Sequence, residues 1–166
     1  MDAKKRTLAR AESTPQAFMG PPSPMQMAKL AWAAGFLDGE ACVHIAKHRH
    51  PGRRTVTYRL AVSIAQNFLP VLEHFRGSVG IDAPIYKTKR ATNHSRQCYT
   101  LNFSGRQALE LLQALAPYLQ RKLEEAQNGF DFWVHGRMGV PGNGKRLDPA
   151  VLAIREHYYQ RMKKLK

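Results

Sequence analysis

The chain has 166 residues, the size of one domain, and its 43% hydrophobic content is enough to bury a substantial core. Lys and Arg number 26 against 12 Asp and Glu, which gives a formal net charge of +14. Such an excess destabilises a compact chain by self-repulsion and indicates a polyanionic partner, nucleic acid above all, or else a place in a ribonucleoprotein.

Cysteine content and apolar runs bear on where the protein works. Cys42 and Cys98 are too few for a disulfide framework, and no zinc-site spacing accompanies them. We therefore expect a reducing, intracellular setting, either a bacterial cytoplasm or an organelle, and not secretion. No stretch reaches the ~18 apolar residues that a membrane span needs. The first 25 residues also lack the apolar core of a signal peptide.

The first third of the sequence predicts an arm, a helix and a hairpin. Residues 1–25 combine basic residues with several prolines and little apolar periodicity, which indicates a flexible arm. A helix is expected from near Met25 to about Gly39. The alternating runs 41–48 and 55–66 then predict a hairpin with one buried face. That face is expected to carry Val43, Ile45, Tyr58, Leu60, Val62 and Ile64.

A helix and a second hairpin are expected next. Residues 68–76 predict a short amphipathic helix stopped by Gly77. The second hairpin is predicted over 85–90 and 97–103, with a polar loop between its strands.

The last part of the chain predicts helices. Ser104 with Gln107 has the capping-box pattern at the start of a Leu-rich helix. Pro117 interrupts that helix, and a new one is expected to begin near it and to run to about Trp133. After a Gly-rich loop at 136–144, Asp148 and Pro149 predict the start of a final, basic helix.

This order of elements predicts an α+β fold. Helix, two strands, helix, two strands and further helices give an αββαββα arrangement, in which a four-stranded antiparallel sheet carries its helices on one face. The expected divisions are an arm at 1–25, a core at 26–135, and a Gly-rich loop with a basic C-terminal helix at 136–166.

The first helix has an unusual construction. Small residues recur along one helical face, at Ala31, Ala34, Gly35 and Asp38. A glycine inside a helix costs about 1 kcal/mol relative to alanine, a cost that the close approach of a second backbone would explain. Asp38 and Glu40 end the helix, where the helix dipole disfavours carboxylates and a divalent cation would reverse that effect. The small face is therefore predicted to be a dimer interface, with paired Glu40 carboxylates holding a hard cation such as Mg²⁺.

The segment 33–41 resembles the LAGLIDADG motif of homing endonucleases in its variant L-A-G-F-[IV]-D-G-[DE]-G. Residues 34–40 fit the motif, whereas Ala33 and Ala41 depart from it. The resemblance covers roughly residues 26–133. With one motif per chain, it implies a homodimeric, site-specific double-strand DNA endonuclease. Such an enzyme uses Mg²⁺, or another divalent cation such as Mn²⁺, at a long pseudo-palindromic site. An RNA-binding intron maturase on the same fold, and a DNA-binding regulator without cleavage activity, are the alternatives.

The resemblance also implies roles for individual residues. Glu40 is the metal ligand, whereas Asp38 belongs to the helix end and the interface. Gln66 matches a polar residue that lies beside the active site at the end of the second strand. Lys122 matches a basic residue that approaches the scissile phosphate, and Arg121 is its rival. The catalytic set is therefore Glu40, Gln66 and Lys122, with an ordinary strand-end amide and a solvated lysine as the plain alternatives for the last two.

The outward face of the predicted sheet is the expected DNA-binding surface. A strand rises about 3.3 Å per residue and B-DNA about 3.4 Å per base, so alternate side chains can follow a groove. The sequence does not decide which side chains of the third strand face outward. They are either Thr88 and Arg90 or Lys87 and Lys89. Lys163, Lys164 and Lys166 are expected at phosphates. The predicted DNA-binding residues are His44, His48, His50, Arg53, Arg54, Thr57, Arg59, Ser63, Lys87, Lys89, Arg90, Arg96, Thr100 and Asn102.

Overall fold

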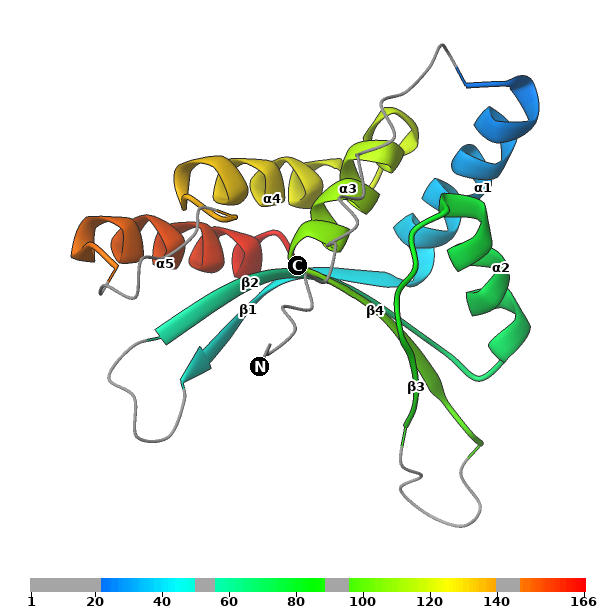
Figure 1. Cartoon of the computed structure of the whole chain (residues 1–166), viewed down its shortest axis with the longest axis horizontal. Coiled ribbons are helices and arrows are strands. Elements are labelled where there is room, and N and C mark those ends of the chain that lie inside the picture. The colour runs from blue at the N-terminus through cyan, green and yellow to red at the C-terminus, as the bar shows by residue number, and fades with distance from the viewer. Residues whose placement is uncertain (1–21, 50–55, 89–95, 140–146) are drawn as a thin grey trace, which may run out of the picture.

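The computed structural model of the chain describes residues 22–49, 56–88, 96–139 and 147–166. Helices cover one face of a single sheet, and the other face carries no helix in this described part (Figure 1). The predicted α+β fold is thereby confirmed. The elements are α1 (Pro24–Glu40), β1 (Ala41–Arg49), β2 (Val56–Gln66), α2 (Leu69–Val79), β3 (Ile85–Lys87), β4 (Tyr99–Ser104), α3 (Arg106–Leu115), the 3-10 turn η1 (Ala116–Tyr118), α4 (Leu123–His135) and α5 (Pro149–Lys164).

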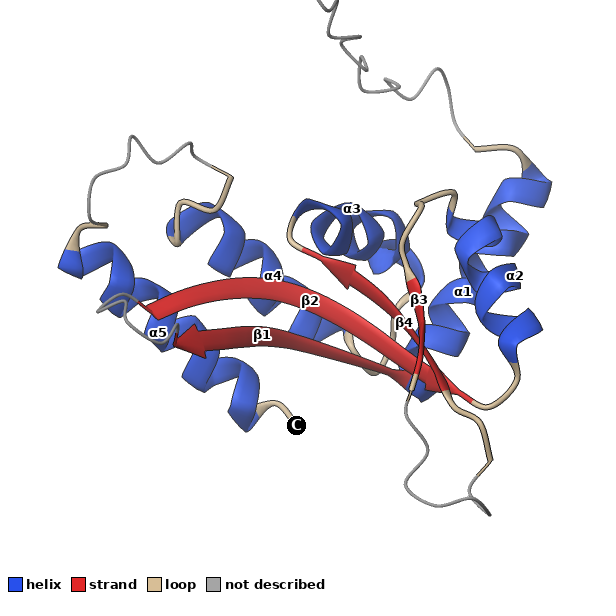
Figure 2. Cartoon of the chain, turned by 60° about the horizontal axis from the view of Figure 1, so that its bottom comes forward, coloured by secondary structure: helices blue, strands red, loops and turns tan. Residues whose placement is uncertain are grey.

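The sheet is antiparallel throughout, in the order β1-β2-β4-β3. Its two long strands, β1 and β2, lie side by side and are curved (Figure 2). Val43 lies opposite Val62, and Val62 lies opposite Phe103, so these side chains share the helix-covered face. All six residues predicted for the buried face of the first hairpin are buried. Because side chains alternate along a strand, the residues between them form the outward face.

The core lies between the sheet and the helices. From α1, Leu30, Ala33 and Leu37 are buried against the core. Phe75 of α2 packs edge-on against Phe103 of β4, with ring centroids 6.1 Å apart. The sequence after the motif thus fixes the carboxyl end of α1 against the sheet, where Glu40 is followed directly by β1.

The predicted end of α2 at Gly77 is wrong. The last residue of the helix is Val79, and Gly80 is its C-cap. Gly80 has a left-handed φ of 68°, and its N–H donates to the carbonyl of Arg76 over 3.1 Å. Both glycines could end a helix, but the added turn brings Val79 into contact with the core. Burial of that side chain therefore favours the later glycine.

The capping box predicted at Ser104 and Gln107 does not form. Ser104 stays in β4, paired with Ala61, and Gly105 with a φ of 61° precedes α3 instead. The N–H of Gly105 donates to the carbonyl of Leu60 over 2.7 Å, while the Gln107 side chain donates to the carbonyl of Asp82. A tertiary strand contact has therefore replaced the local cap.

The helix predicted to start near Pro117 begins later. Pro117 lies in η1, and α4 begins at Leu123. Between them, the backbone N–H groups of residues 120–122 point to the carboxylate of Asp38. This long-range contact takes the place of the helical turn that the proline pattern predicted.

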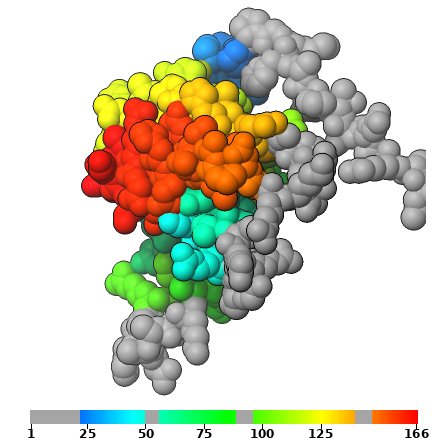
Figure 3. Space-filling view, turned by 90° about the vertical axis from the view of Figure 1, so that its left-hand side faces the viewer, coloured from blue at the N-terminus to red at the C-terminus, as the bar shows by residue number. Residues whose placement is uncertain are grey.

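The final helix packs against α4 and β1, and Figure 3 shows its surface beside that of α4. Asp148 and Pro149 begin it as predicted, with the Asp148 carboxylate accepting from Ala150 N over 2.9 Å. Glu156 joins the helix to the sheet, because it accepts from Tyr58 and lies 2.8 Å from Lys47 Nζ. Hydrogen bonds from Lys47, Tyr58 and Gln160 lower the pKa of Glu156 to about 2. No helix in the described ranges is long and apolar enough to cross a membrane.

Candidate active site and nucleic-acid interface

Two of the predicted catalytic side chains meet at the carboxyl end of α1. Glu40 is the last residue of α1, and Gln66 is the last residue of β2. Gln66 Nε2 donates to Glu40 Oε2 over 2.7 Å, although the residues are 26 positions apart. The side chain of Glu40 is exposed. Its carboxylate is therefore oriented by an amide and accessible from solvent.

Asp38 occupies the same helix end but makes different contacts. Its carboxylate accepts from the backbone N–H of Gln120 at 2.8 Å, of Arg121 at 3.2 Å and of Lys122 at 2.9 Å. Burial raises the pKa of Asp38, but these hydrogen bonds and the charge of Lys122 lower it more, so the net shift is downward. Asp38 is thus an ionised acceptor whose oxygens already have partners.

Lys122 and its rival Arg121 both lie against this end of α1. Lys122 is 7% exposed and is the N-cap residue of α4, which rules out the plain alternative of a solvated lysine. Arg121 is exposed, and its Nη1 donates to the backbone carbonyl of Asp38 over 3.4 Å. The structure therefore gathers Glu40, Gln66 and the 121–122 pair around one helix terminus.

The donors at this terminus suit a hard cation only in part. No group of three or more His, Cys, Asp or Glu side chains in the described ranges is placed to hold a metal ion. Mg²⁺, however, is commonly bound by one or two carboxylates together with phosphate and water oxygens. The exposed carboxylate of Glu40 fits that requirement if a second copy and a substrate phosphate complete the set.

The face of α1 that was predicted to form a dimer interface is exposed in part. Ala31 and Gly35 are exposed, and a Cβ added to Gly35 would meet no atom of residues 22–49, 56–88, 96–139 and 147–166 within 4 Å. Ala34 is 0% exposed, so its assignment to the interface is wrong. The helix turns Ala34 toward the core beside Ala33 and Leu37. The depression beside this face is lined by Ala31, Gly35, Asp38, Pro117, Tyr118, Leu119 and Gln120.

The outward face of the sheet is polar and lacks carboxylates. Register places His48 opposite Thr57 and Ser63 opposite Asn102 on this face, away from the helices. None of the strand residues of the described sheet is Asp or Glu. Outward residues on β1, β2 and β4 that agree with the prediction are His44, His48, Thr57, Arg59, Ser63, Thr100 and Asn102.

The structure settles the phase of the third strand. Tyr86 lies opposite Thr100, and Thr88 Oγ1 lies 3.3 Å from Thr100 Oγ1, so Tyr86 and Thr88 face outward. Lys87 lies opposite Tyr99, so its assignment to the outward face is wrong: strand alternation turns it to the helix side. Tyr86, which is 55% exposed, was missed, although alternation from an inward Ile85 would have found it.

Several predicted contacts cannot be placed on the sheet. Arg96 is exposed just before β4. His50, Arg53, Arg54, Lys89 and Arg90 lie outside the described residues.

The basic end of α5 lies beside the outward face. Lys166 Nζ approaches Cys42 Sγ to 3.0 Å, and Cys42 is an outward residue of β1. Burial lowers the pKa of His44, as do the neighbouring charges of Lys166 and His48, although a hydrogen bond to the Cys42 carbonyl opposes them. A groove here is lined by Cys42, His44, Ile45, Tyr159, Met162, Lys163 and Lys166.

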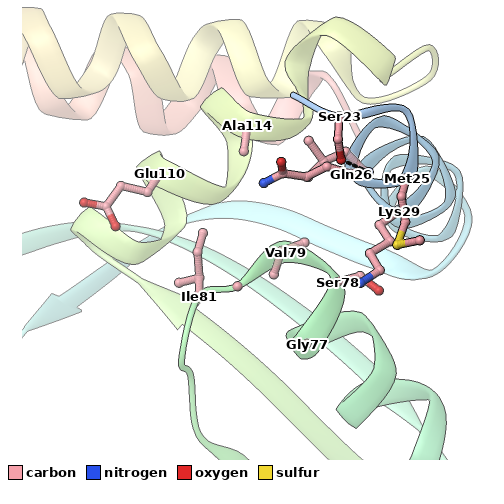
Figure 4. A pocket seen from close by; sticks show the side chains of 12 residues that line it. Ser23, Met25, Gln26, Lys29, Gly77, Ser78, Val79, Ile81, Glu110 and Ala114 are labelled. Atoms are coloured by element: carbon pink, nitrogen blue, oxygen red, sulfur yellow. Dashed lines mark hydrogen bonds between the residues drawn. The ribbon is translucent and has the colours of Figure 1, made fainter. Parts of the chain in front are cut away.

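Another depression lies away from these residues. It opens between the amino end of α1, the carboxyl end of α2 and α3, as Figure 4 shows. Lys29 and Glu110 are its charged lining residues, and it contains none of the predicted catalytic side chains. This depression is therefore separate from the end of α1 where Glu40 and Gln66 meet.

Neither protein-family models nor curated proteins gave a match. Comparison with solved structures did give matches. The homing endonuclease I-CvuI bound to DNA is 21% identical over 86% of this chain and 84% of that one, with a TM-score of 0.66. The archaeal intron-encoded homing endonuclease I-Vdi141I, also bound to DNA, is 18% identical over 85% and 86%, with a TM-score of 0.64. I-LtrWI, a LAGLIDADG homing endonuclease bound to its target, is 14% identical over 97% and 48%, with a TM-score of 0.62. This chain has the fold of the LAGLIDADG homing endonucleases.

Proposed function

We propose that this chain is a site-specific double-strand DNA endonuclease that acts as a homodimer and uses a divalent cation at Glu40. The observation that carries the proposal is the hydrogen bond from Gln66 to Glu40 at the end of the sheet. It orients an accessible carboxylate beside a surface suited to nucleic acid. The DNA-bound structures that share this fold support the same conclusion.

Charge and shape favour duplex DNA on the outward face. The net charge of +14 favours binding to a polyanion, and the strands that form this face contribute no carboxylate to oppose it. β2 has 11 residues, so its outward side chains can follow several base pairs along the major groove. Arg59 has a side chain that can form a bidentate pair with guanine, and Asn102 has one that can do so with adenine.

The open face of α1 supports a homodimer. Two copies could pack closely at Gly35, because no described residue fills the space beside its Cα. A twofold axis through these helices would bring both Glu40 carboxylates and both helix termini together. The target would then be pseudo-palindromic, since twofold protein symmetry is matched by the symmetry of the half-sites.

The residues at the helix terminus have complementary tasks in hydrolysis. Gln66 fixes the carboxylate orientation of Glu40 by donating to one of its oxygens. Lys122, which is largely desolvated, would place a positive charge near the scissile phosphate, where charge develops during cleavage. A divalent cation, when bound at Glu40, would lower the pKa of the attacking water and stabilise the phosphate charge.

The proposal is tested by selecting duplexes from a random DNA pool on the purified protein without divalent cation, and then adding Mg²⁺. We expect a selected duplex to be bound and then cut in both strands. Glu40→Gln should bind it with unchanged affinity but fail to cut it. Glu110→Gln is the matched control, because Glu110 is an exposed carboxylate on α3, outside this site, and should cut like wild type. Cleavage by Glu40→Gln at the wild-type rate would refute the role of Glu40. A consistent preference for structured RNA over every duplex would favour the maturase instead.

A further inference from the structure

Three successive backbone N–H groups converge on one side chain from a distant part of the chain. Asp38 Oδ2 accepts from Gln120 and Arg121, and Oδ1 accepts from Lys122, over distances between 2.8 and 3.2 Å. The donors lie 82 to 84 positions from the acceptor. Both carboxylate oxygens are therefore used within the protomer.

These contacts cap the turn that leads into α4, because the three N–H groups belong to the N-cap residue of α4 and to the two residues before it. The first N–H groups of a helix have no partner inside it and are usually capped by the side chain of a nearby residue. The N-cap residue of α4 is Lys122, and its side chain makes no capping bond. Asp38 from α1 accepts from the N–H of Lys122 and from the N–H groups of the two residues before it, so the carboxyl end of α1 is joined to the turn that begins α4. The negative carboxylate also suits the positive end of that helix dipole.

Each of the two segments that Asp38 joins carries a residue of the proposed active site. Glu40 follows Asp38 by two positions, in the last turn of the same helix. Lys122 is one of the three residues whose N–H groups Asp38 binds, and it is 7% exposed. Because the backbone on both sides is fixed by one carboxylate, the spacing of Glu40 and Lys122 depends on Asp38.

We propose that Asp38 is a positioning residue for the cleavage step, which holds Lys122 in place relative to Glu40. The proposal rests on the proposed function and deepens it. It gives the two carboxylates of the motif different roles. Both oxygens of Asp38 accept from backbone N–H groups, whereas Glu40 is exposed and accepts from one side-chain amide. Asp38 therefore acts through Lys122 and does not touch the substrate.

A double-mutant cycle on a selected duplex tests this coupling under single-turnover conditions. Asp38→Asn keeps the size of the side chain but replaces one acceptor oxygen with a donor that faces the N–H groups. We expect the cleavage rate to fall about 10- to 100-fold, as for a misplaced catalytic group, with the duplex dissociation constant unchanged. In a Lys122→Met background, Asp38→Asn should slow cleavage no further, because residues that act together are not additive. Independent, multiplying effects would overturn the proposal.

Asp131→Asn is the matched control. Asp131 lies on α4, where its carboxylate accepts from Gln127 over 3.0 Å and faces Arg161, so it shares the helix but not the cap. Its variant should cleave like wild type. Should Asp38→Asn not fold, Asp38→Glu retains the charge with a longer side chain and enters the same cycle.

Amide hydrogen exchange in the free protein, without cation or DNA, gives a readout independent of activity. We expect faster exchange at residues 120–122 in Asp38→Asn, and unchanged exchange there in Lys122→Met. Unchanged exchange in Asp38→Asn would also overturn the proposal. Failure of the wild type to cut its selected duplex would instead refute the proposed function, so the two failures are distinguishable.

Discussion

Gly35→Ala should stabilise the isolated chain and weaken its dimer. Gly35 lies inside α1 and is exposed, and among the described residues no atom lies within 4 Å of a Cβ added there. Alanine in an exposed helix interior is favoured over glycine by about 1 kcal/mol. For a domain of this size, that gain corresponds to a rise of about 3 °C in the melting temperature. In the isolated protomer, Gly35→Ala is therefore expected to raise the free energy of unfolding.

If a second copy packs on α1, the same substitution is expected to destabilise the dimer. A methyl group added to a well-packed contact costs about 1–3 kcal/mol, and a twofold interface receives it twice. The dimer would lose at least about 2 kcal/mol, which raises its dissociation constant by about 30-fold or more. Gly77→Ala is the matched control, because Gly77 is also an exposed, helical glycine with open space beside it, but lies on α2.

Two measurements separate these effects. Chemical unfolding at concentrations where the chain is monomeric should show that both variants are stabilised by a similar amount. Analytical ultracentrifugation should show weaker self-association for Gly35→Ala only. If Gly35→Ala dimerises as tightly as Gly77→Ala, the α1 face is not the interface. If Gly77→Ala is no more stable than wild type, replacing an exposed helical glycine with alanine does not stabilise this chain, which contradicts the expected gain.

Three further outcomes are expected. The pKa of Glu156 is about 2 in the folded chain against an ordinary value of 4.5, so its contribution to stability is present above about pH 4.5 and is lost as the pH falls toward about 2. Glu156→Gln should therefore destabilise the chain at neutral pH, and the difference from wild type in denaturant titrations should vanish near pH 2; a pH-independent difference would contradict this linkage. Tyr86→Ala should weaken binding to a selected duplex by roughly 1 kcal/mol or more, whereas Lys87→Ala should change it less, because only Tyr86 faces outward; equal losses in a fluorescence titration would contradict the register. Replacing Lys163 and Lys166 together by Gln should reduce the slope of log affinity against log salt by about 1 for each phosphate that the lysines neutralise, and an unchanged slope would place the end of α5 away from DNA.

The strand faces could be predicted because burial and alternation share one period. Val43 and Val62 had to face the helices once one face of the hairpin was buried, and the structure confirms this. The approach of Gln66 to Glu40 was implied by the motif and by the strands after it, and the hydrogen bond confirms that they meet. For Lys87, the third strand was too short and too mixed in composition to reveal its phase.

Other features have no local signal in the sequence. Ala34 is small and apolar, so it suits both a core and a helix interface, and periodicity could not choose between them. Gly77 and Gly80 both resemble helix stops, and only the packing of Val79 selects the second. The cap that Asp38 gives to α4 depends on backbone N–H groups 82 or more positions away, which any residue except proline provides.

Subunit mixing tests the central claim, that each cleavage-competent site needs Glu40 from two chains. Wild-type and Glu40→Gln chains are mixed in equal amounts, allowed to exchange, and assayed at constant total protein for the cutting of each DNA strand, with single-strand nicks counted. If both carboxylates are required, only dimers of two wild-type chains cut, and the rate falls to about one quarter of the unmixed wild-type rate. A fall to about one half would mean that each chain cuts on its own, and would contradict the shared site at the end of α1.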